Sequence, residues 1–173
     1  MVTFFYKCTI TLHMKRIALL SRESFIEVLT KKDLKPINDY LKTHFGVQLE
    51  NGFAYLLSTK NNLYMVTRQL QDVDIKRLRI SSIGLYIGEW RKEELRFSIE
   101  GSQLLGHKAS KSIIDLSSEE VGQWMRGQPL NKITNETGYV LVRHNKDYLG
   151  CGRVKDGSLL NFVPKTRWVK ELA

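Results

Sequence analysis

Histidines and cysteines are the residues of this chain best suited to acid–base, nucleophilic or metal chemistry. None of the four histidines pairs with another at the spacing that zinc ligands need. They are His13, His44, His107 and His144. Cys8 and Cys151 lie far apart and form neither a CxxC pair nor a disulfide framework. Cys151 has glycine on both sides and no assignable base, which favours a small buried residue over a nucleophile.

Phosphate-cradling and nucleophile motifs do not occur in the sequence. There is no GxGxxG after a strand, no GxxxxGK[ST] and no GxSxG. The short run Gly150-Cys151-Gly152 is more typical of a strand in which small residues permit close packing. The sequence therefore predicts a protein that is not an enzyme and that uses no metal or cofactor.

What remains is binding chemistry, indicated first by charge. The chain has 27 Lys and Arg against 18 Asp and Glu, a formal net charge of +9. Residues 1–101 hold 16 cations and 11 anions, and residues 102–173 hold 11 and 7, so both halves are basic. An evenly basic folded protein favours a polyanionic partner such as RNA, DNA or an acidic membrane surface. Solubility alone is the alternative explanation.

In the C-terminal half, cations alternate with planar groups. Lys and Arg neutralise phosphates, and aromatic rings or guanidinium planes stack on unpaired bases. The residues concerned are Arg126, Gln128, Lys132, Tyr139, Arg143, Arg153, Lys165, Arg167 and Trp168.

The stretch "WMRGQPL", residues 124–130, joins a charge, a glycine and a proline where an amphipathic run ends. A helix C-terminus favours a cation such as Arg126, and Gly127 can then reverse the chain with a positive φ. This bend is either a plain helix cap or a glycine loop on which a ribose-phosphate backbone lies against bare peptide. The residue pattern alone leaves both interpretations open.

Composition bounds the architecture that must position these residues. The 173 residues are 42% hydrophobic, enough for one domain or two small ones with a real core. No apolar run approaches the roughly 20 residues that span a bilayer, so we expect a cytoplasmic protein without a membrane segment. Residues 1–13 resemble a β-strand more than a signal peptide, and they could equally be an annotation extension.

In the first half, helical spacing is expected from Ser21, where Ser24 and Glu27 fit a capping box. "KKDLK" breaks that pattern, and Pro36 suits the first turn of a second helix that Gly46 ends. Its apolar stripe is Ile37, Tyr40, Leu41 and Phe45. "FAYLLSTKNNLYMVT" predicts a hairpin, "RQLQDVD" a short helix, and "KRLRISSIGLYIGEW" and "ELRFSIEG" two strands. Core candidates in the first of these strands are Leu78, Ile80, Ile83, Leu85 and Ile87.

The second half begins after "GSQLLGHKAS", residues 101–110, which has the glycines and serines of a linker. "SIIDL" reads as a buried strand, and Ser117 or Ser118 then caps a helix with Val121, Trp124 and Met125 facing inward. Four short strand-like pieces follow: "QPLNKI", "GYVLVR", "DYLGCGRV" and "SLLNFVP". Their spacing favours a small barrel or pseudobarrel.

This order, a strand, a short helix ending in "RGQPL", "GYVLVR", "LGCGRV" and "LLNFVPKTRW", resembles the PUA domain over about residues 107–173. PUA domains are RNA-binding β pseudobarrels. With "LYMV", "SSIGLYIGEW" and "LRFSIEGSQLL" before it, the chain also resembles an archaeal and eukaryotic biogenesis factor of the large ribosomal subunit. The implied fold is α+β: an α/β pre-PUA domain in residues 1–103 and a PUA domain in residues 104–173.

The resemblance implies a non-catalytic RNA-binding protein that assists rRNA processing or assembly of the large ribosomal subunit. Its implied partners are rRNA, pre-rRNA or tRNA and ribosome-assembly proteins. Carried onto matching segments, it nominates Arg126, Gly127, Gln128, Lys132, Arg143, Arg153, Lys165, Arg167 and Trp168 as RNA-binding residues. "LLNFVPKTRW" also resembles the end of Sun-type rRNA cytosine-5 methyltransferases. The sequence shows no S-adenosylmethionine glycine loop, so the alternative is an accessory domain that supplies RNA affinity to a separate RNA methyltransferase.

Overall fold

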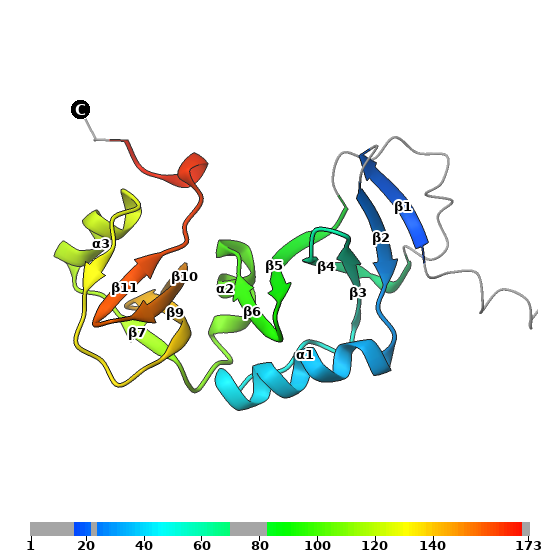
Figure 1. The fold of residues 1–173 in the computed structure, drawn as a ribbon, viewed down its shortest axis with the longest axis horizontal. Coiled ribbons are helices and arrows are strands. Elements are labelled where there is room, and N and C mark those ends of the chain that lie inside the picture. Colours follow the sequence, from blue (N-terminus) through cyan, green and yellow to red (C-terminus); the bar gives the residue numbers. More distant parts are fainter. Residues whose placement is uncertain (1–15, 22–23, 70–82, 171–173) are drawn as a thin grey trace, which may run out of the picture.

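The computed structural model describes residues 16–21, 24–69 and 83–170, and within them two sheets lie on either side of a short helix, α2 (Figure 1). The first sheet is antiparallel, with its strands in sequence order. These strands are β1 (Arg16–Ser21), β2 (Ser24–Val28), β3 (Phe53–Ser58), β4 (Asn62–Thr67), β5 (Leu85–Arg91) and β6 (Glu94–Phe97). The three helices described are α1 (Lys31–His44), α2 (Ile99–Gly106) and α3 (Ser118–Met125).

The second sheet has the order β7-β9-β10-β11-β8 and forms a half-barrel. Its strands are β7 (Ile113–Asp115), β8 (Leu130–Asn131), β9 (Gly138–His144), β10 (Asp147–Lys155) and β11 (Ser158–Asn161). β7 pairs with β9 in parallel, and the other pairs are antiparallel. The four predicted C-terminal strands, the buried "SIIDL" strand and the hairpin of β3 and β4 are confirmed. The two strands predicted from "KRLRISSIGLYIGEW" and "ELRFSIEG" are confirmed as β5 and β6, except that the second ends at Phe97 and its last residues begin helix α2.

The prediction of a helix from Ser21 is wrong, because Ser24–Val28 form strand β2. Ile26 is fully buried and lies opposite Ser58 of β3, so pairing with the sheet prevails over the local capping pattern. The next helix also begins earlier than expected. Thr30 and Asp33 form a capping box at its start, so "KKDLK" is its first turn rather than a break. Pro36 consequently lies inside α1.

The proposed linker at residues 101–110 is wrong over most of its length, because Ile99–Gly106 form helix α2. Ser98 caps the helix by accepting a hydrogen bond from the Gly101 amide at 2.8 Å. Gly101 is buried against strand β5, and a Cβ there would lie 2.0 Å from the Ile87 carbonyl oxygen. At the other end, Gly106 lies against the Tyr148 ring of β10. The glycines therefore permit close packing on both sheets rather than a loose connection.

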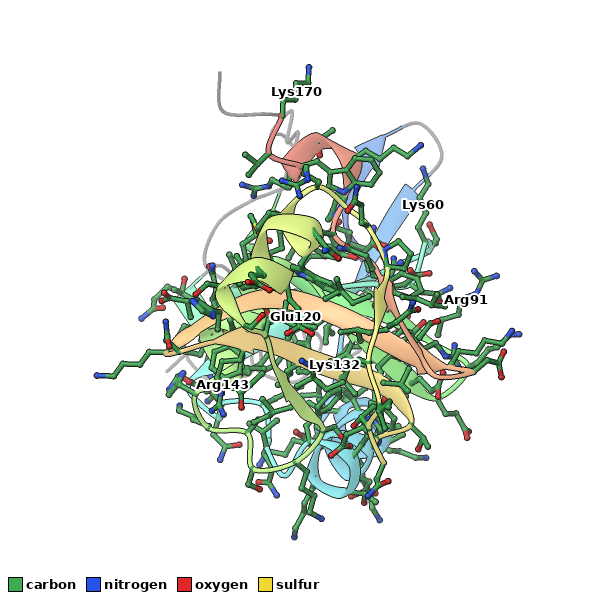
Figure 2. The ribbon with its side chains drawn as sticks, turned by 90° about the vertical axis from the view of Figure 1, so that its left-hand side faces the viewer. Lys60, Arg91, Glu120, Lys132, Arg143 and Lys170 are labelled. Carbon is green, nitrogen blue, oxygen red and sulfur yellow. The ribbon has the colours of Figure 1, made fainter. Side chains whose placement is uncertain are left out.

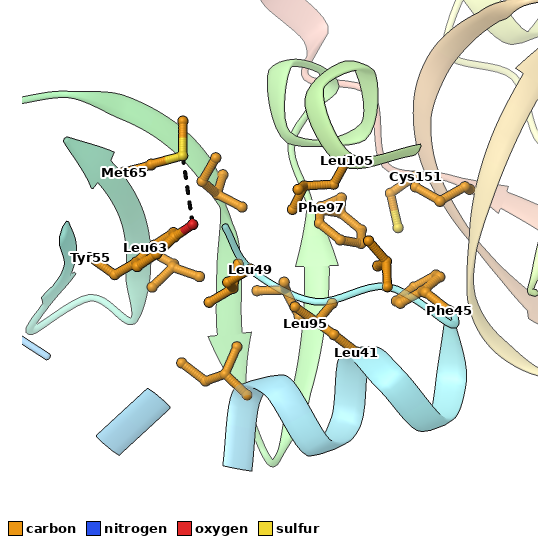
Figure 3. Packing of buried hydrophobic residues seen from close by; sticks show 14 of the residues in the cluster. Leu41, Phe45, Leu49, Tyr55, Leu63, Met65, Leu95, Phe97, Leu105 and Cys151 are labelled. Carbon is orange, nitrogen blue, oxygen red and sulfur yellow. Dashed lines mark hydrogen bonds between the residues drawn. The ribbon is translucent and has the colours of Figure 1, made fainter. Parts of the chain in front are cut away.

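One hydrophobic core runs from the first sheet, between α1 and α2, into the second sheet (Figure 3). Leu41 of α1 and Phe45, which caps its C-terminus, join Leu95 and Phe97 of the first sheet in this core, as the helical stripe predicted. The residues that the second sheet contributes to this core are Leu141, Tyr148 and Cys151. A separate cluster around Trp124 fills the second sheet's other side. The predicted division of the chain after residue 103 stays a prediction, and α2 spans that position.

The end of α1 adds polar contacts between the two parts. The His44 ring donates from Nε2 to the Tyr139 carbonyl oxygen of β9 at 2.5 Å. The Phe45 carbonyl accepts from the amides of Ser110 and Lys111, at 3.0 and 3.2 Å. These hydrogen bonds fix the segment between α2 and β7, so the position of the second sheet depends on helix α1.

Three expectations fall outside the described residues: a strand in residues 1–13, the burial of Leu78 and Ile80, and most of the "RQLQDVD" helix. Ile83 and Ile87 are buried as predicted. In the part of the chain that the structure describes, no helix is both long and apolar enough to cross a bilayer.

We expect Gly101→Ala to lower the free energy of unfolding by about 1–3 kcal/mol, because the added methyl group overpacks the contact between α2 and β5. This loss should exceed the gain of up to about 1 kcal/mol in helix propensity. Gly52→Ala, where a Cβ meets nothing within 4 Å, is the control and should change stability by less than about 0.5 kcal/mol. Urea denaturation measures both; equal stabilities would contradict the close packing of α2.

Candidate nucleic-acid interface

Helix α3 positions the "MRGQPL" bend. Ser117, one of the two caps that the sequence predicted, forms a capping box with Glu120 at its start. Trp124, near its end, is fully buried and donates from Nε1 to the Leu149 carbonyl oxygen at 3.2 Å. The helix is therefore held on the second sheet by one large side chain, which fixes where the bend after it lies.

Gly127 takes the left-handed conformation that the sequence predicted, with φ of +79°. Its amide donates to the Trp124 carbonyl oxygen at 2.9 Å. The Asn161 side chain, from the end of β11, donates to that same oxygen at 2.7 Å. The bend is thus a helix cap that strand β11 reinforces.

The segment after β11 folds back over this bend. A Cβ on Gly127 would lie 2.0 Å from the Trp168 indole, which itself donates from Nε1 to the Val163 carbonyl oxygen at 2.9 Å. The Val169 amide donates to the Met125 carbonyl oxygen at 3.0 Å. The Trp168 indole therefore covers Gly127, where the glycine-loop interpretation expected bare peptide against a ribose-phosphate backbone. Contact of Gly127 with RNA stays a prediction.

Six of the nominated residues meet at this place, which we call the cap surface. They are Arg126, Gly127, Gln128, Lys165, Arg167 and Trp168. Arg126 and Gln128 are exposed after α3, and Lys165 and Arg167 are exposed on a 3₁₀ turn, Lys165–Arg167. The Lys165 ammonium lies 5.8 Å from the centre of the Trp168 ring, within cation–π distance. Arg126 forms no ion pair with any described residue.

Arg167 connects the cap surface to the first part of the chain. Its guanidinium forms an ion pair with Glu100 in the first turn of α2. The Arg167 side chain remains 59% exposed, so water screens the pair and its net stabilisation is about 0–1 kcal/mol. A phosphate group could therefore replace Glu100 at low cost.

Lys132 and Arg143 do not join the cap surface; both are paired with carboxylates elsewhere on the second sheet (Figure 2). Lys132 bonds both carboxylate oxygens of Glu120, at 2.8 and 2.7 Å. Arg143 makes two hydrogen bonds to Asp115 of β7, at 2.7 and 2.8 Å. These hydrogen bonds lower the pKa of the Glu120 and Asp115 carboxyl groups.

Arg153 lies between the two sheets. Its guanidinium is 4.9 Å from the centre of the Tyr139 ring and 3.4 Å from a Glu94 carboxylate oxygen of β6. The Arg153 side chain is only partly exposed. Its contacts with Tyr139 and Glu94 are sufficient to stabilise a cation between the sheets without an RNA ligand.

Cys151 is buried, as expected from its glycine neighbours. Burial raises the pKa of its thiol to about 12, so a thiolate is scarce at neutral pH. Within the described ranges, no three His, Cys, Asp or Glu side chains gather as a metal ion would require.

A cleft that the sequence did not indicate lies beside the cap surface, between the start of α2 and the segment after β11. Its volume is about 540 Å³. Tyr86 and Arg96 line it from the first sheet, and Phe162 and Arg167 line it from the C-terminal segment. We call it the junction cleft. Only the pairing of segments far apart in sequence creates it, so no local pattern could have predicted it.

The comparisons with known proteins agree with this geometry. The model of the methyltransferase RsmF PUA domain matches residues 111–168, which include β7, α3 and the whole cap surface. The second sheet with α3 is therefore a PUA-like domain, as the resemblance implied.

The relatives found include ribosomal RNA small subunit methyltransferase F of two Aeromonas species and of Vibrio vulnificus. The Aeromonas hydrophila protein is 25% identical over 138 residues, covering 79% of this chain and 28% of the relative. The Aeromonas salmonicida protein is 24% identical with the same coverage, and the Vibrio vulnificus protein is 21% identical over 105 residues, covering 61% of this chain and 22% of the relative.

This chain thus spans about 28% of the length of the relatives that match it over the most residues. An alignment of 138 residues cannot fit within residues 111–173, so the likeness includes part of the first sheet. These relatives are bacterial and are not large-subunit assembly factors, so they do not support the archaeal kinship that the sequence suggested.

Gly127→Ala should loosen the C-terminal segment, because the methyl group displaces the Trp168 indole. We expect faster trypsin cleavage after Lys165 and Arg167, followed by mass spectrometry. Gly157→Ala is the matched control, since φ there is +75° and a Cβ meets nothing within 4 Å. Both variants carry a backbone strain of about 1–2 kcal/mol, so equal cleavage rates would show that Trp168 does not hold the segment.

Stability should fall in acid because of the Glu120 and Asp115 pairs. Their folded-state pKa values are lowered, so the unfolded chain binds protons first as pH falls below the ordinary values of 4.5 and 3.8. The pairs therefore contribute fully above about pH 5 and are lost progressively below it. Glu120→Gln should weaken this pH dependence by roughly 0.2–1 kcal/mol in urea titrations between pH 7 and pH 3.

Glu119→Gln is the control for that measurement, because Glu119 is exposed and bonds no described residue through its side chain. A pH dependence that is unchanged in Glu120→Gln, or changed equally in both variants, would contradict the assignment.

Proposed function

We propose that this chain is a non-catalytic RNA-binding module that brings ribosomal RNA to a methylation reaction. One observation carries the proposal: all six residues of the cap surface lie within the segment that matches the PUA domain of an RNA methyltransferase. Arg126, Lys165 and Arg167 supply three positive charges there, beside a fixed indole. Such a combination fits phosphates and an adjacent unpaired base.

The first prediction, assistance in rRNA processing or large-subunit assembly, has less support than the accessory alternative. The printed names of the relatives are those of small-subunit rRNA methyltransferases, which favours a role linked to methylation. A catalytic methyltransferase domain, in the same or a separate polypeptide, would be the functional partner. The cytoplasmic location expected from the sequence remains part of this proposal.

We rank the cations of the cap surface as proposed phosphate contacts by whether each one already pairs with a carboxylate. Arg126 and Lys165 form no ion pair with a described carboxylate, whereas Arg167 must leave Glu100 to meet a phosphate. Lys132, Arg143 and Arg153 are paired with carboxylates elsewhere, and we assign them secondary roles.

Filter binding with rRNA fragments, tRNA and duplex DNA tests the proposal. We expect salt-dependent binding to RNA, with log K falling by about 0.7 per log unit of salt for each phosphate contacted on a single strand. Arg126→Ala and Lys165→Ala should each lower the slope by about 0.7, which corresponds to a loss of about fivefold in affinity at 0.1 M salt.

Lys60→Ala is the matched control, because Lys60 is exposed on the turn between β3 and β4 and pairs with no described carboxylate, and Figure 1 shows these strands on the far side of α2 from the second sheet. It removes the same charge and should leave RNA affinity and slope nearly unchanged. If all three variants lost affinity equally, net charge rather than the cap surface would explain binding. If the unmodified chain bound no RNA, the proposed function would be refuted.

A further inference from the structure

We propose that the junction cleft receives one unpaired nucleotide of the RNA strand whose backbone lies on the cap surface. This inference rests on the proposed function and extends it to a second site. The cleft is formed by both parts of the chain, whereas the PUA-domain match begins only at residue 111. No family match accounts for its first-sheet wall.

The size of the cleft fits such a ligand. At about 540 Å³, it falls within the range of about 300–1,000 Å³ that small-ligand sites occupy. A cleft of this volume is larger than a single side chain of a partner requires, and it is large enough for a base with its sugar.

Planar groups line the cleft from both sides. Tyr86 belongs to β5, and Phe162 follows β11, so the aromatic walls come from the two different sheets. The Arg96 guanidinium lies 5.2 Å from the centre of the Phe162 ring, and Glu89 holds its other side by an ion pair. The Arg96 side chain is therefore held in place before a ligand arrives. Proteins bind unpaired bases by stacking them on aromatic rings and guanidinium planes of this kind.

The polar groups at the rim suit the rest of a nucleotide. Arg167 lines the cleft and belongs to the cap surface as well, so it lies where a strand would pass from one site to the other. Glu100 lines the same rim and neutralises Arg167 in the absence of RNA. A phosphate would compete with this carboxylate, so Glu100 acts as an internal competitor whose removal favours RNA.

A protein ligand fits less well. The lining of the cleft combines the planar groups of Tyr86 and Phe162 with Arg167, which is free to meet an anionic strand once a phosphate displaces Glu100.

Fluorescence of an RNA strand that carries 2-aminopurine at one unpaired position tests the inference, since stacking quenches this base. We expect quenching when the unmodified chain binds and a loss of quenching in Phe162→Leu, with affinity for that strand lowered at least about fivefold. Phe53→Leu, a half-buried aromatic on the first sheet outside the cleft, is the matched control and should keep both signals. Binding of a blunt RNA duplex should be the same for all three proteins.

Glu100→Gln gives an opposite and independent signal. Removal of the competing carboxylate should raise affinity for the unpaired strand severalfold, while Glu93→Gln, an exposed carboxylate on the turn between β5 and β6, should not. Quenching and affinity that persist in Phe162→Leu, with no gain in Glu100→Gln, would overturn the cleft and leave the proposed function intact. Loss of all RNA binding by the unmodified chain would overturn both.

Discussion

The packing of α2 between the two sheets is the constraint on which the rest of the structure depends. Gly101 allows the helix to touch the backbone of β5, and Gly106 allows it to touch the Tyr148 ring of β10. Because interiors are close-packed, neither contact can shift without the other. A helix of eight residues would be marginal alone, and burial on both sides stabilises it. The two parts of the chain therefore share one core rather than a flexible connection.

Both candidate binding sites follow from this rigid junction. The C-terminal segment returns from β11 to cover the bend after α3, and Arg167 on that segment reaches Glu100 at the start of α2. The cap surface and the junction cleft thus have a common border at one residue. If α2 were a loose linker, the first sheet would not form a wall of the cleft, and the cap surface would belong to the PUA-like domain alone.

Local patterns in the sequence predicted helices and their caps better than they predicted which elements pack or pair with one another. The stripe of Ile37, Tyr40, Leu41 and Phe45 and a cap at Ser117 or Ser118 were predicted correctly, because both depend on residues three or four positions apart. The helix expected from Ser24 was wrong because its partner strand begins at Phe53. The prediction of a linker was wrong because glycine occurs both in flexible segments and where two elements pack closely. Only the surface that packs against the glycine distinguishes the two cases.

At the candidate site, the local sequence likewise did not predict which cations pair with carboxylates. Six cations were nominated, but Lys132, Arg143, Arg153 and Arg167 each lie beside a carboxylate that is remote in sequence. A formal charge of +9 therefore overstates the field that an RNA strand meets, because paired cations attract phosphates less than free ones do. Of the six, Arg126 and Lys165 pair with no described carboxylate, and they are the phosphate contacts that we propose. With so few proposed phosphate contacts, stacking on aromatic groups would supply much of the affinity for RNA, and the aromatic walls of the junction cleft would complement the cap surface.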